Sequence, residues 1–343
     1  MKVVQFLASN GWGGMENVFV SLCNELSKNI KIEVIVFDNK FIIDRLSKDI
    51  KIHRLFSSQS RFNPLLYIEI GKILKKIKPD IVHTHGAKAT EIFYRLNKLL
   101  NIKHVATKHN SRKGSIFNKV EYVTAVSNGA RKTIETSKVK IIYNGIEPVK
   151  LSFSNIKNNI FTILAIGRLD KIKGFDILIR ECSKLDFDFR LNIVGDGGER
   201  ENLKKITKEL NLNDQVELVG FRHDIPELMN QADLVVVSSH NEGFSLVITE
   251  ALFYAQMLIS RNVGIAKEIL SENFLIDEFK IAEKINNVYN NLEKYKNKFF
   301  EFSKDKKAKF MLSNIGKEYI NFYIEILDKN YIKKLTMDLN ENT

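Results

Sequence analysis

Short apolar runs alternate with longer stretches of helical periodicity along most of the chain. In the first half the apolar runs fall at residues 3–7, 32–37, 81–84, 104–107, 122–126 and 140–143, and the helical stretches include residues 16–28 and 64–77. Short apolar runs bounded by polar or glycine residues are typical of buried strands. Strands that alternate with helices predict a parallel, doubly wound β-sheet.

The same plan starts again in the second half, with apolar runs at residues 161–166, 189–194, 216–219, 234–238 and 258–259. Between the two sets, residues 152–159 are polar and lack periodicity, which indicates a linker. The pattern therefore predicts an α/β protein with two Rossmann-like domains, which we assign to residues 1–150 and 151–311. Closure of the domains about residues 148–160 would exclude water from a site that they share.

The most informative local pattern is EGFSLVITE, residues 242–250, which follows the apolar run 234–238 and leads into a helix-forming segment. This loop lies at the carboxyl end of a predicted parallel strand, where open sheets bind their ligands. Gly243 allows the backbone to approach a ligand closely. Ser245 is the expected N-cap, which leaves the backbone amides at the helix start facing an anion such as a diphosphate.

The hypothesis of a diphosphate-binding and sugar-binding loop rests on three backbone amides and two carboxylates. The amides belong to Phe244, Ser245 and Leu246. Glu242 is placed to hold hydroxyls of a transferred sugar, and Glu250, one turn into the helix, to accept hydrogen bonds from a ribose. An N-capped helix with two solvated acids accounts for the pattern equally well.

A cationic loop follows the first predicted strand of the second domain, at residues 167–174 (GRLDKIKG). Arg168 and Lys173 are placed there to neutralise a diphosphate leaving group, and stabilisation of developing charge is a large part of catalysis in group transfer. The alternative is a pair of solvated loop cations. The sequence has no His or Cys cluster suited to a metal, so we expect no cofactor. Two further strand-end loops, residues 194–200 and the loop with Phe221, can line a nucleotide base.

The first glycine loop, residues 10–16 (NGWGGME), follows the first strand and opens a helix. It departs from a dinucleotide fingerprint because Glu16 stands where a Gly or Ala is required. A nicotinamide-dependent dehydrogenase is therefore disfavoured. Gly13 and Gly14 remain as a flexible loop that can touch a substrate, or as a simple turn between strand and helix.

Charge is unevenly distributed along the chain. Residues 1–150 hold 26 Lys and Arg against 12 Asp and Glu, whereas residues 151–343 hold 27 against 29. A basic amino-terminal half predicts contact with a polyanion, either nucleic acid or an anionic membrane surface. The amphipathic stretch with Lys72, Lys75, Lys76 and Lys78 suits a membrane interface, and an ordinary solvated lysine face explains it equally well. The basic half lacks an aromatic-interleaved recognition motif, which disfavours nucleic acid.

Location follows from what the chain lacks. No apolar run reaches the roughly 18 residues that a membrane-spanning helix needs, and the apolar start is too short for a signal peptide. Cys23 and Cys182 fall in separate halves without metal-type spacing, so neither a disulfide nor a zinc site is expected. We expect a cytoplasmic protein, with peripheral contact to the cytoplasmic face of the inner membrane as a further hypothesis.

The ordered series of motifs resembles the retaining GT-B glycosyltransferases, and within them glycosyltransferase family four (glycosyl transferases group 1) of the bacterial surface-polysaccharide and lipopolysaccharide type. Besides the loops above, the motifs are PDIVHTHG at residues 79–86, VS at 126–127, YNGI at 143–146 and VGDG at 194–197. The resemblance runs from residue 1 to about residue 328. It implies a GT-B fold, in which two Rossmann-like domains face each other across a cleft and a last helix, about residues 312–330, crosses back to the first domain.

The resemblance also implies roles for single residues. The first domain would bind the acceptor and the second the donor nucleotide. Arg168 and Lys173 would contact the diphosphate, and His109 would reach the transferred sugar from the first domain. Together with Glu242, these are the expected catalytic residues. The expected donor-binding residues are Gly13, Gly14, Arg168, Lys173, Phe221, Glu242, Gly243, Phe244, Ser245, Leu246 and Glu250.

A few positions depart from the family pattern. Ala255 and Met257 stand where a Gly and a Pro are usual, and Gly264 is followed by Ile265 instead of a second Gly. Residues 271–277 are abbreviated. These departures affect one wall of the expected donor pocket, and none removes a charged residue named above.

The expected reaction moves a hexosyl unit from a nucleoside diphosphate sugar, a UDP-sugar by family habit, to a lipid-linked saccharide or a lipopolysaccharide core. It would proceed with retention and without a metal. Two alternatives are a noncatalytic GT-B binding partner of a true transferase and a UDP-sugar epimerase of the same architecture. The complete charged set argues against the first, and the basic first domain argues against the second.

Overall fold

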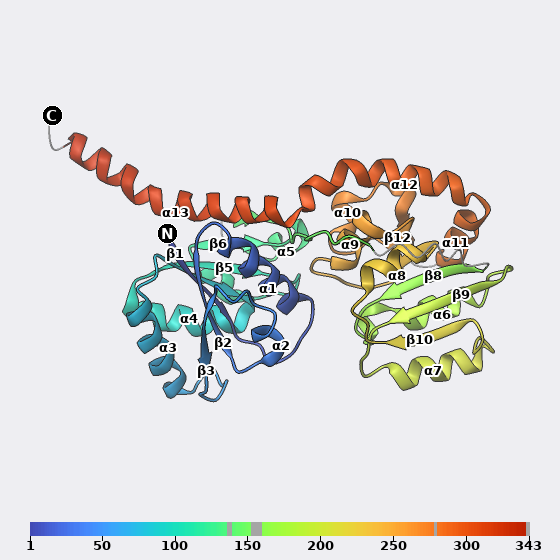
Figure 1. The fold of residues 1–343 in the computed structure, drawn as a ribbon, viewed down its shortest axis with the longest axis horizontal. Coiled ribbons are helices and arrows are strands. Elements are labelled where there is room, and N and C mark those ends of the chain that lie inside the picture. Colours follow the sequence, from blue (N-terminus) through green and yellow to red (C-terminus); the bar gives the residue numbers. More distant parts are fainter. Residues whose placement is uncertain (136–138, 152–159, 278–279, 341–343) are drawn as a thin grey trace. The chain divides into compact units, whose positions relative to one another are not determined.

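The computed structural model describes residues 1–135, 139–151, 160–277 and 280–340 (Figure 1). The chain divides into two compact units, Met1–Glu147 with Met311–Thr343, and Pro148–Phe310. The expected linker, residues 152–159, lies outside the described residues. Each unit contains one parallel sheet, so the predicted α/β fold with two Rossmann-like halves is confirmed.

The sheet of the first unit has the strand order β3-β2-β1-β4-β5-β6-β7. The strands are β1 Lys2–Leu7, β2 Lys31–Phe37, β3 Lys51–Leu55, β4 Ile81–His85, β5 Lys103–Lys108, β6 Tyr122–Ala125 and β7 Val139–Ile141. The order reverses between β1 and β4, and open parallel sheets bind ligands beside such a switch point. The sequence pattern does not predict β3, because charged and polar residues interrupt its apolar run at the edge of the sheet.

Helices cover both faces of this sheet. One face packs against α1 Gly14–Ser27, α2 Lys40–Ile43 and α13 Leu312–Asn340, and the other against α3 Pro64–Ile77 and α4 Gly86–Leu100. Shorter helical segments are η1 Ser115–Lys119 and α5 Asn128–Arg131. Because successive residues of a strand point to opposite faces, Val3 of β1 lies in the core under α1 and α13, and Val4 lies in the core under α3 and α4.

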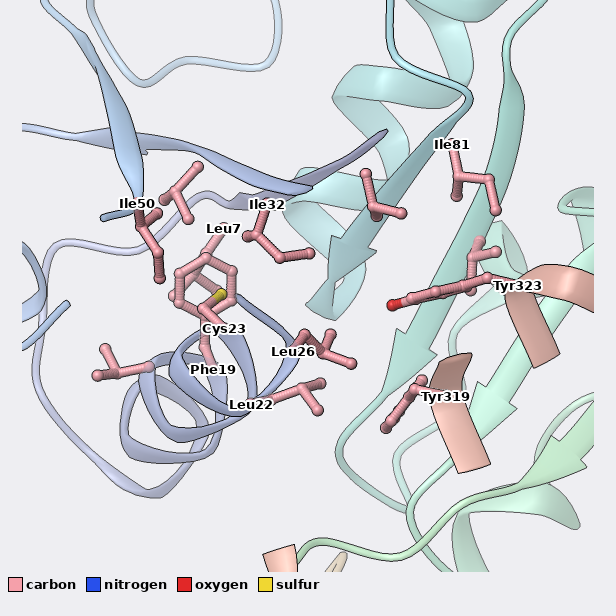
Figure 2. Close-up of a cluster of buried hydrophobic side chains, with 14 of the residues drawn as sticks. Leu7, Phe19, Leu22, Cys23, Leu26, Ile32, Ile50, Ile81, Tyr319 and Tyr323 are labelled. Atoms are coloured by element: carbon pink, nitrogen blue, oxygen red, sulfur yellow. The ribbon is translucent and has the colours of Figure 1, made fainter. Parts of the chain in front are cut away.

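The last helix belongs to the core of the first unit. Ile315, Tyr319, Tyr323 and Ile326 of α13 are all buried, and Figure 2 shows the two tyrosine rings projecting from α13 into the hydrophobic cluster. Gly145 permits this contact, since a Cβ there would lie 2.7 Å from the Cα of Leu312. The helix expected near residues 312–330 therefore exists and runs on to residue 340.

Helix α3 shows how the sequence sets one element. Asn63 caps its start by accepting from the amide of Leu65, Pro64 occupies the first turn, and Lys78 ends the helix in a left-handed conformation with φ of 51°. Ile70 and Leu74 are buried against the sheet, which stabilises the unit by about 1.5–3 kcal/mol for each side chain. The apolar side of the expected membrane-surface helix is therefore largely occupied by the protein's own core.

The second unit repeats the plan with the strand order β10-β9-β8-β11-β12-β13. Its strands are β8 Phe161–Ile166, β9 Phe189–Val194, β10 Val216–Gly220, β11 Leu234–Val237, β12 Leu258–Arg261 and β13 Leu275–Ile276. Its helices are η2 Lys171–Lys173, α6 Phe175–Cys182, α7 Arg200–Glu209, α8 Ile225–Gln231, α9 Leu246–Tyr254, α10 Ala266–Ile269, η3 Glu272–Phe274, α11 Ile281–Asn290, α12 Leu292–Lys307 and η4 Ala308–Phe310. The order here reverses between β8 and β11. Two residues are too few for the sequence pattern to predict β13.

In the described part of the chain, no helix combines the length and the apolar character that crossing a bilayer requires.

Candidate functional site

The loops after β8 and β11 meet at the switch point of the second unit. Because these strands are parallel neighbours, residues 167–174 and 238–245 leave the same edge of the sheet. Lys173 Nζ lies 2.6 Å from Glu242 Oε1, and the two side chains are only 20% and 13% exposed. The structure thus brings together two residues that the sequence analysis assigned to the donor.

Neighbouring groups hold this ion pair in place. The hydroxyl of Ser239 donates to Glu242 Oε1 over 2.8 Å, and the hydroxyl of Ser238 donates to the carbonyl of Lys173 over 2.8 Å. Gly174 has φ of 63°, and a Cβ at this residue would lie 2.6 Å from the carbonyl oxygen of Ser238. The contact between the two loops therefore depends on a glycine at this position.

A second glycine lies directly against the acid of the pair. Gly264 has φ of 53°, and a Cβ there would lie 2.7 Å from the Cβ of Glu242. Any side chain at this position would displace the carboxylate. Where the family usually has two glycines, this chain keeps only Gly264. The loop that carries Glu242 packs against this glycine.

Helix α9 begins where the sequence predicts, but its cap differs. Ser245 is the N-cap residue, yet its hydroxyl makes no capping hydrogen bond and is buried without a partner among the described residues. The predicted N-cap position is therefore confirmed, although the Ser245 hydroxyl does not make the capping hydrogen bond that is usual for a serine there. The first amides of a helix have no intrahelical partner, and the positive end of the helix dipole favours an anion. Gly243 and the buried Phe244 precede this end, and Leu246 opens the helix.

Glu250 lies one turn further along α9 and is half-buried. Burial raises its pKa to about 7, because a carboxylate loses hydration in a partly closed environment. At neutral pH the carboxyl is therefore divided between its neutral and ionised forms. Hydroxyl donors that reach it would favour the ionised form.

Arg168 and Phe221 are more exposed than the residues of the pair. Arg168 Nε lies 2.9 Å from Asp170 Oδ2, and its side chain is 77% exposed. Exposed ion pairs of this kind contribute little, so Arg168 can exchange Asp170 for an anion. Phe221 follows β10 and is 60% exposed, with its ring edge-to-face against His223. Both residues follow strands at the same sheet edge as Lys173 and Glu242.

Sequence reasoning missed one buried cation at this edge. Arg261 ends β12 and is buried, and its Nη1 lies 2.9 Å from His240 Nδ1. The two residues line an open pocket of about 450 Å³ together with Asn262, Val263, Leu275, Ile276 and Asp277. The only hint in the sequence is that Arg261 stands at the end of an apolar strand. An arginine at that place is usually solvated, so the sequence alone does not indicate that it is buried.

The first unit presents its own loops at the switch point between β1 and β4. Gly13 precedes α1, and Gly14 is its first residue. Glu16 is buried and accepts a hydrogen bond from the hydroxyl of Ser9. Glu16, the residue that departs from the dinucleotide fingerprint, therefore fills the space beside the glycine loop with its side chain.

His109 directly follows β5 and is half-buried. Its Nε2 lies 3.1 Å from Nδ1 of His85, the last residue of β4, and the two rings stack with centroids 5.3 Å apart. Burial lowers the pKa of His109 to about 4, so the imidazole is neutral at physiological pH. His109, Gly13 and Gly14 belong to the first unit, whereas the Lys173–Glu242 pair belongs to the second.

Within the described ranges, no three His, Cys, Asp or Glu side chains gather as a metal-binding group. The expectation of no metal also took the sequence to lack an Asp-x-Asp pair, and this is wrong, because Asp186 and Asp188 form one. Both residues are exposed and precede β9, so they lie at the sheet edge opposite the donor loops. Cys23 and Cys182 are buried and free.

Two parallel-sheet units, each with its polar loops at a switch point, define the GT-B class of glycosyltransferase folds. The crystal structure of Anabaena Alr3699/HepE in complex with UDP-glucose has this fold. It matches with a TM-score of 0.83 over 96% of this chain and 100% of its own, at 20% identity. Residues 12–150 match the family described as Glycosyltransferase Family 4, and residues 150–305 match Glycosyl transferases group 1. The chain therefore belongs to the group 1 glycosyltransferases.

Two curated relatives come from bacterial glycan assembly. The N-acetylgalactosamine-N,N'-diacetylbacillosaminyl-diphospho-undecaprenol 4-alpha-N-acetylgalactosaminyltransferase of Campylobacter jejuni is 24% identical over 88% of this chain and 96% of its own length. The lipopolysaccharide core biosynthesis glycosyltransferase LpsD of Rhizobium meliloti is 25% identical over 69% of this chain and 72% of its own.

Proposed function

We propose that the protein transfers a hexosyl unit from a UDP-sugar to a hydroxyl of a lipid-linked saccharide or lipopolysaccharide core, with retention and without a metal. The observation that carries this proposal is the Lys173–Glu242 ion pair at the switch point of the second unit. The relatives support the acceptor class, because one is named for an undecaprenyl diphosphate saccharide and the other for the lipopolysaccharide core. The UDP-glucose complex of the Anabaena protein supports the donor.

The donor diphosphate would lie at the start of α9. The amides of the first turn and the Lys173 ammonium supply positive charge there, and Arg168 adds to it from the neighbouring loop. Negative charge grows on the diphosphate as the bond to the sugar breaks, so fixed positive groups stabilise the transition state more than the ground state. The same groups can take the place that a cation holds in metal-dependent transferases.

Glu242 suits a sugar-holding role better than a nucleophilic one. Its Oε1 accepts hydrogen bonds from both Lys173 and Ser239, and such bonds lower the nucleophilicity of a carboxylate. The departing diphosphate can instead take the proton of the acceptor hydroxyl, which then attacks from the same face of the sugar. This route yields retention without a covalent intermediate.

His109 would contact the transferred sugar from the first unit. Its imidazole has a pKa of about 4 and is therefore neutral, so it would interact with the sugar through a hydrogen bond and not through charge. Glu250, whose pKa is about 7, would accept hydrogen bonds from the ribose hydroxyls.

The acceptor reaches the enzyme from a membrane, and the first unit has a surface that suits one. This membrane face comprises four exposed apolar residues, Phe56 (79% exposed), Phe62 (75%), Leu65 (65%) and Ile68 (53%). Its cations are Arg61, Lys72, Lys75, Lys76 and Arg95, which are exposed on the β3–α3 loop, α3 and α4. Apolar side chains surrounded by Lys and Arg bind anionic bilayers through burial and charge together.

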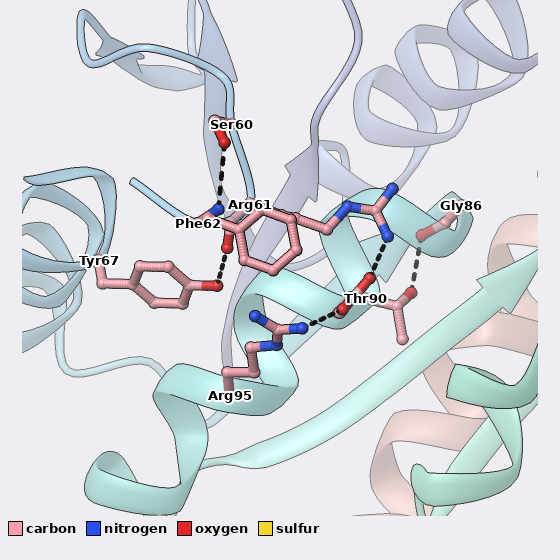
Figure 3. Close-up of polar contacts among 8 residues, drawn as sticks. Ser60, Arg61, Phe62, Tyr67, Gly86, Thr90 and Arg95 are labelled. Carbon is pink, nitrogen blue, oxygen red and sulfur yellow. Dashed lines mark hydrogen bonds and ion pairs between the residues drawn. The ribbon is translucent and has the colours of Figure 1, made fainter. Parts of the chain in front are cut away.

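The acids within the membrane face are already paired. The Glu91 carboxylate accepts hydrogen bonds from the guanidinium groups of Arg61 and Arg95. The Cζ atom of Arg95 also lies 5.3 Å from the centroid of the Phe62 ring (Figure 3). Glu69 accepts from the backbone amides of Phe56 and Ser57. These carboxylates are therefore engaged by the protein and repel anionic lipid less than free acids would.

The proposed function is tested by UDP release from a panel of UDP-sugars, with and without a lipid extract of bacterial membranes, in the presence of EDTA. We expect release from one donor that requires the extract and survives EDTA. Interconversion of a UDP-sugar without the extract would instead identify an epimerase. Absence of both turnover and nucleotide binding, with UDP-, GDP- and ADP-sugars alike, would identify a noncatalytic binding protein.

A further inference from the structure

An unusual set of polar side chains lies in the core of the first unit. Gln5, His83 and Thr107 come from the neighbouring strands β1, β4 and β5, and Tyr323 comes from α13. The register pairs Gln5 with His83 and His85 with Thr107, so all of these strand residues face α13. Buried polar groups are costly unless they are hydrogen-bonded. Their partners therefore need to be traced.

The contacts form a continuous chain from α13 to His109. Tyr323 Oη lies 2.6 Å from His83 Nδ1 and 3.1 Å from Gln5 Nε2. Gln5 Oε1 lies 2.8 Å from His85 Nε2, and His85 Nδ1 lies 3.1 Å from His109 Nε2. The tyrosine hydroxyl is thus linked to the sugar-facing imidazole through one amide and one buried ring.

The orientation of the Gln5 amide fixes the direction of every bond in this chain. Its Nε2 donates to Tyr323, so its Oε1 can only accept, and His85 Nε2 must carry a proton. Burial lowers the pKa of His85 well below its ordinary value, so the ring is neutral and its Nδ1 is an acceptor. His109 Nε2 must then donate to His85. The remaining nitrogen of His109, Nδ1, carries the lone pair.

We propose that Gln5, His85 and Tyr323 are positioning residues that hold the ring plane and the tautomer of His109, so that its Nδ1 accepts a hydrogen bond from a substrate hydroxyl. This inference rests on the sugar-facing role of His109 in the proposed function. Helix α13 would therefore contribute to the reaction as well as to the core. A tyrosine near the carboxyl end of the chain sets the hydrogen-bonding state of an imidazole at the end of β5.

Two tyrosines on α13 separate positioning from packing. Tyr319 is one turn before Tyr323, is equally buried in the same cluster (Figure 2), and its hydroxyl contacts Thr107 at 3.4 Å. Among the described residues, the Tyr319 hydroxyl has no hydrogen bond to Gln5 or His85. Tyr323→Phe removes the acceptor for the Gln5 amide and frees that amide to rotate. Tyr319→Phe removes a hydroxyl from the same core and leaves the chain to His109 intact.

The first arm of the test is imidazole nitrogen NMR on the intact protein labelled with ¹⁵N-histidine, without substrate. We expect the wild type to show a single neutral tautomer of His109, protonated at Nε2. Tyr323→Phe should give a mixture of tautomers, and Tyr319→Phe should match the wild type. A His109 that is protonated at Nδ1, or mixed, in the wild type would overturn the proposal even if the variants failed to fold.

The second arm measures turnover and nucleotide affinity. Tyr323→Phe should lower kcat roughly tenfold, because a misplaced group loses catalytic geometry, while UDP affinity stays that of the wild type. Equal losses in the two tyrosine variants would mean that the hydroxyls serve packing alone, which would overturn the proposal. If His109→Ala leaves kcat unchanged, the sugar-facing role in the proposed function fails, whereas the NMR arm still reports on the hydrogen bonds.

Discussion

At the scale of single residues, Lys173 is central to the proposed function. We expect Lys173→Ala to reduce turnover by about a hundredfold or more, because it removes a fixed charge aimed at the leaving diphosphate. Circular dichroism should show an unchanged fold, since the side chain is partly exposed and outside the core. Lys171→Ala, an exposed lysine in the same helical turn, is the matched control and should retain activity. Full activity in Lys173→Ala would show that Lys173 does not stabilise the leaving diphosphate.

The proposed ribose contact of Glu250 predicts that nucleotide affinity depends on pH. Ribose hydroxyls would donate to the carboxylate, so binding would favour the ionised form of a group whose pKa is about 7 in the free protein. As pH falls below 7, binding must expel a proton, and affinity for UDP should drop by up to about tenfold for each pH unit. Calorimetry should show this slope in the wild type and in Glu283→Gln, an exposed control on α11. Glu250→Gln should lose it, and a slope that persists there would contradict the ribose role.

The raised pKa of Glu250 also affects stability, with a definite sign. Between the ordinary carboxyl value of 4.5 and about 7, the folded protein keeps a proton that the unfolded chain has lost. Stability from this group is therefore complete below the ordinary value and declines as pH rises toward 7. Glu250→Gln should flatten this decline in urea unfolding measured across that window.

At the scale of elements, the sequence pattern predicts most strands, because strands buried on both faces read as apolar runs, and it locates the helices α1, α3, α9 and α13. It misses β3 and β13, where the runs are interrupted or too short. It also places Ser245 at the start of α9 without revealing that its hydroxyl makes no cap. The Arg261–His240 contact and the chain from Tyr323 to His109 join residues far apart in sequence, so no local pattern can predict them.

Helix α3 carries a prediction of its own. Leu65→Ser with Ile68→Ser removes the exposed apolar side chains of this helix and leaves its buried side unchanged. Cosedimentation with phosphatidylglycerol vesicles should weaken strongly, because both the apolar contact and the alignment of Lys72 with the surface are lost. Phe300→Ser removes a similarly exposed apolar residue, 60% exposed, from α12 of the second unit and serves as the control. Equal binding by all three proteins would exclude this membrane face.

At the scale of the whole molecule, the proposed reaction draws on both units. The second unit would provide fixed positive charge for the donor nucleotide through Lys173 and the start of α9. The first would provide a neutral histidine, positioned through Tyr323 of α13, and a basic surface for the acceptor.

The most direct test of this account is the fate of the sugar itself. The protein is incubated with a UDP-hexose ¹³C-labelled at the anomeric carbon and with a lipid-linked saccharide fraction, and the lipid product is examined by NMR. We predict that the label enters the lipid fraction with the anomeric configuration of the donor, and that Lys173→Ala abolishes the transfer. Label found only in free hexose or in another UDP-sugar would contradict glycosyl transfer to a lipid-linked acceptor, and an inverted product would contradict retention.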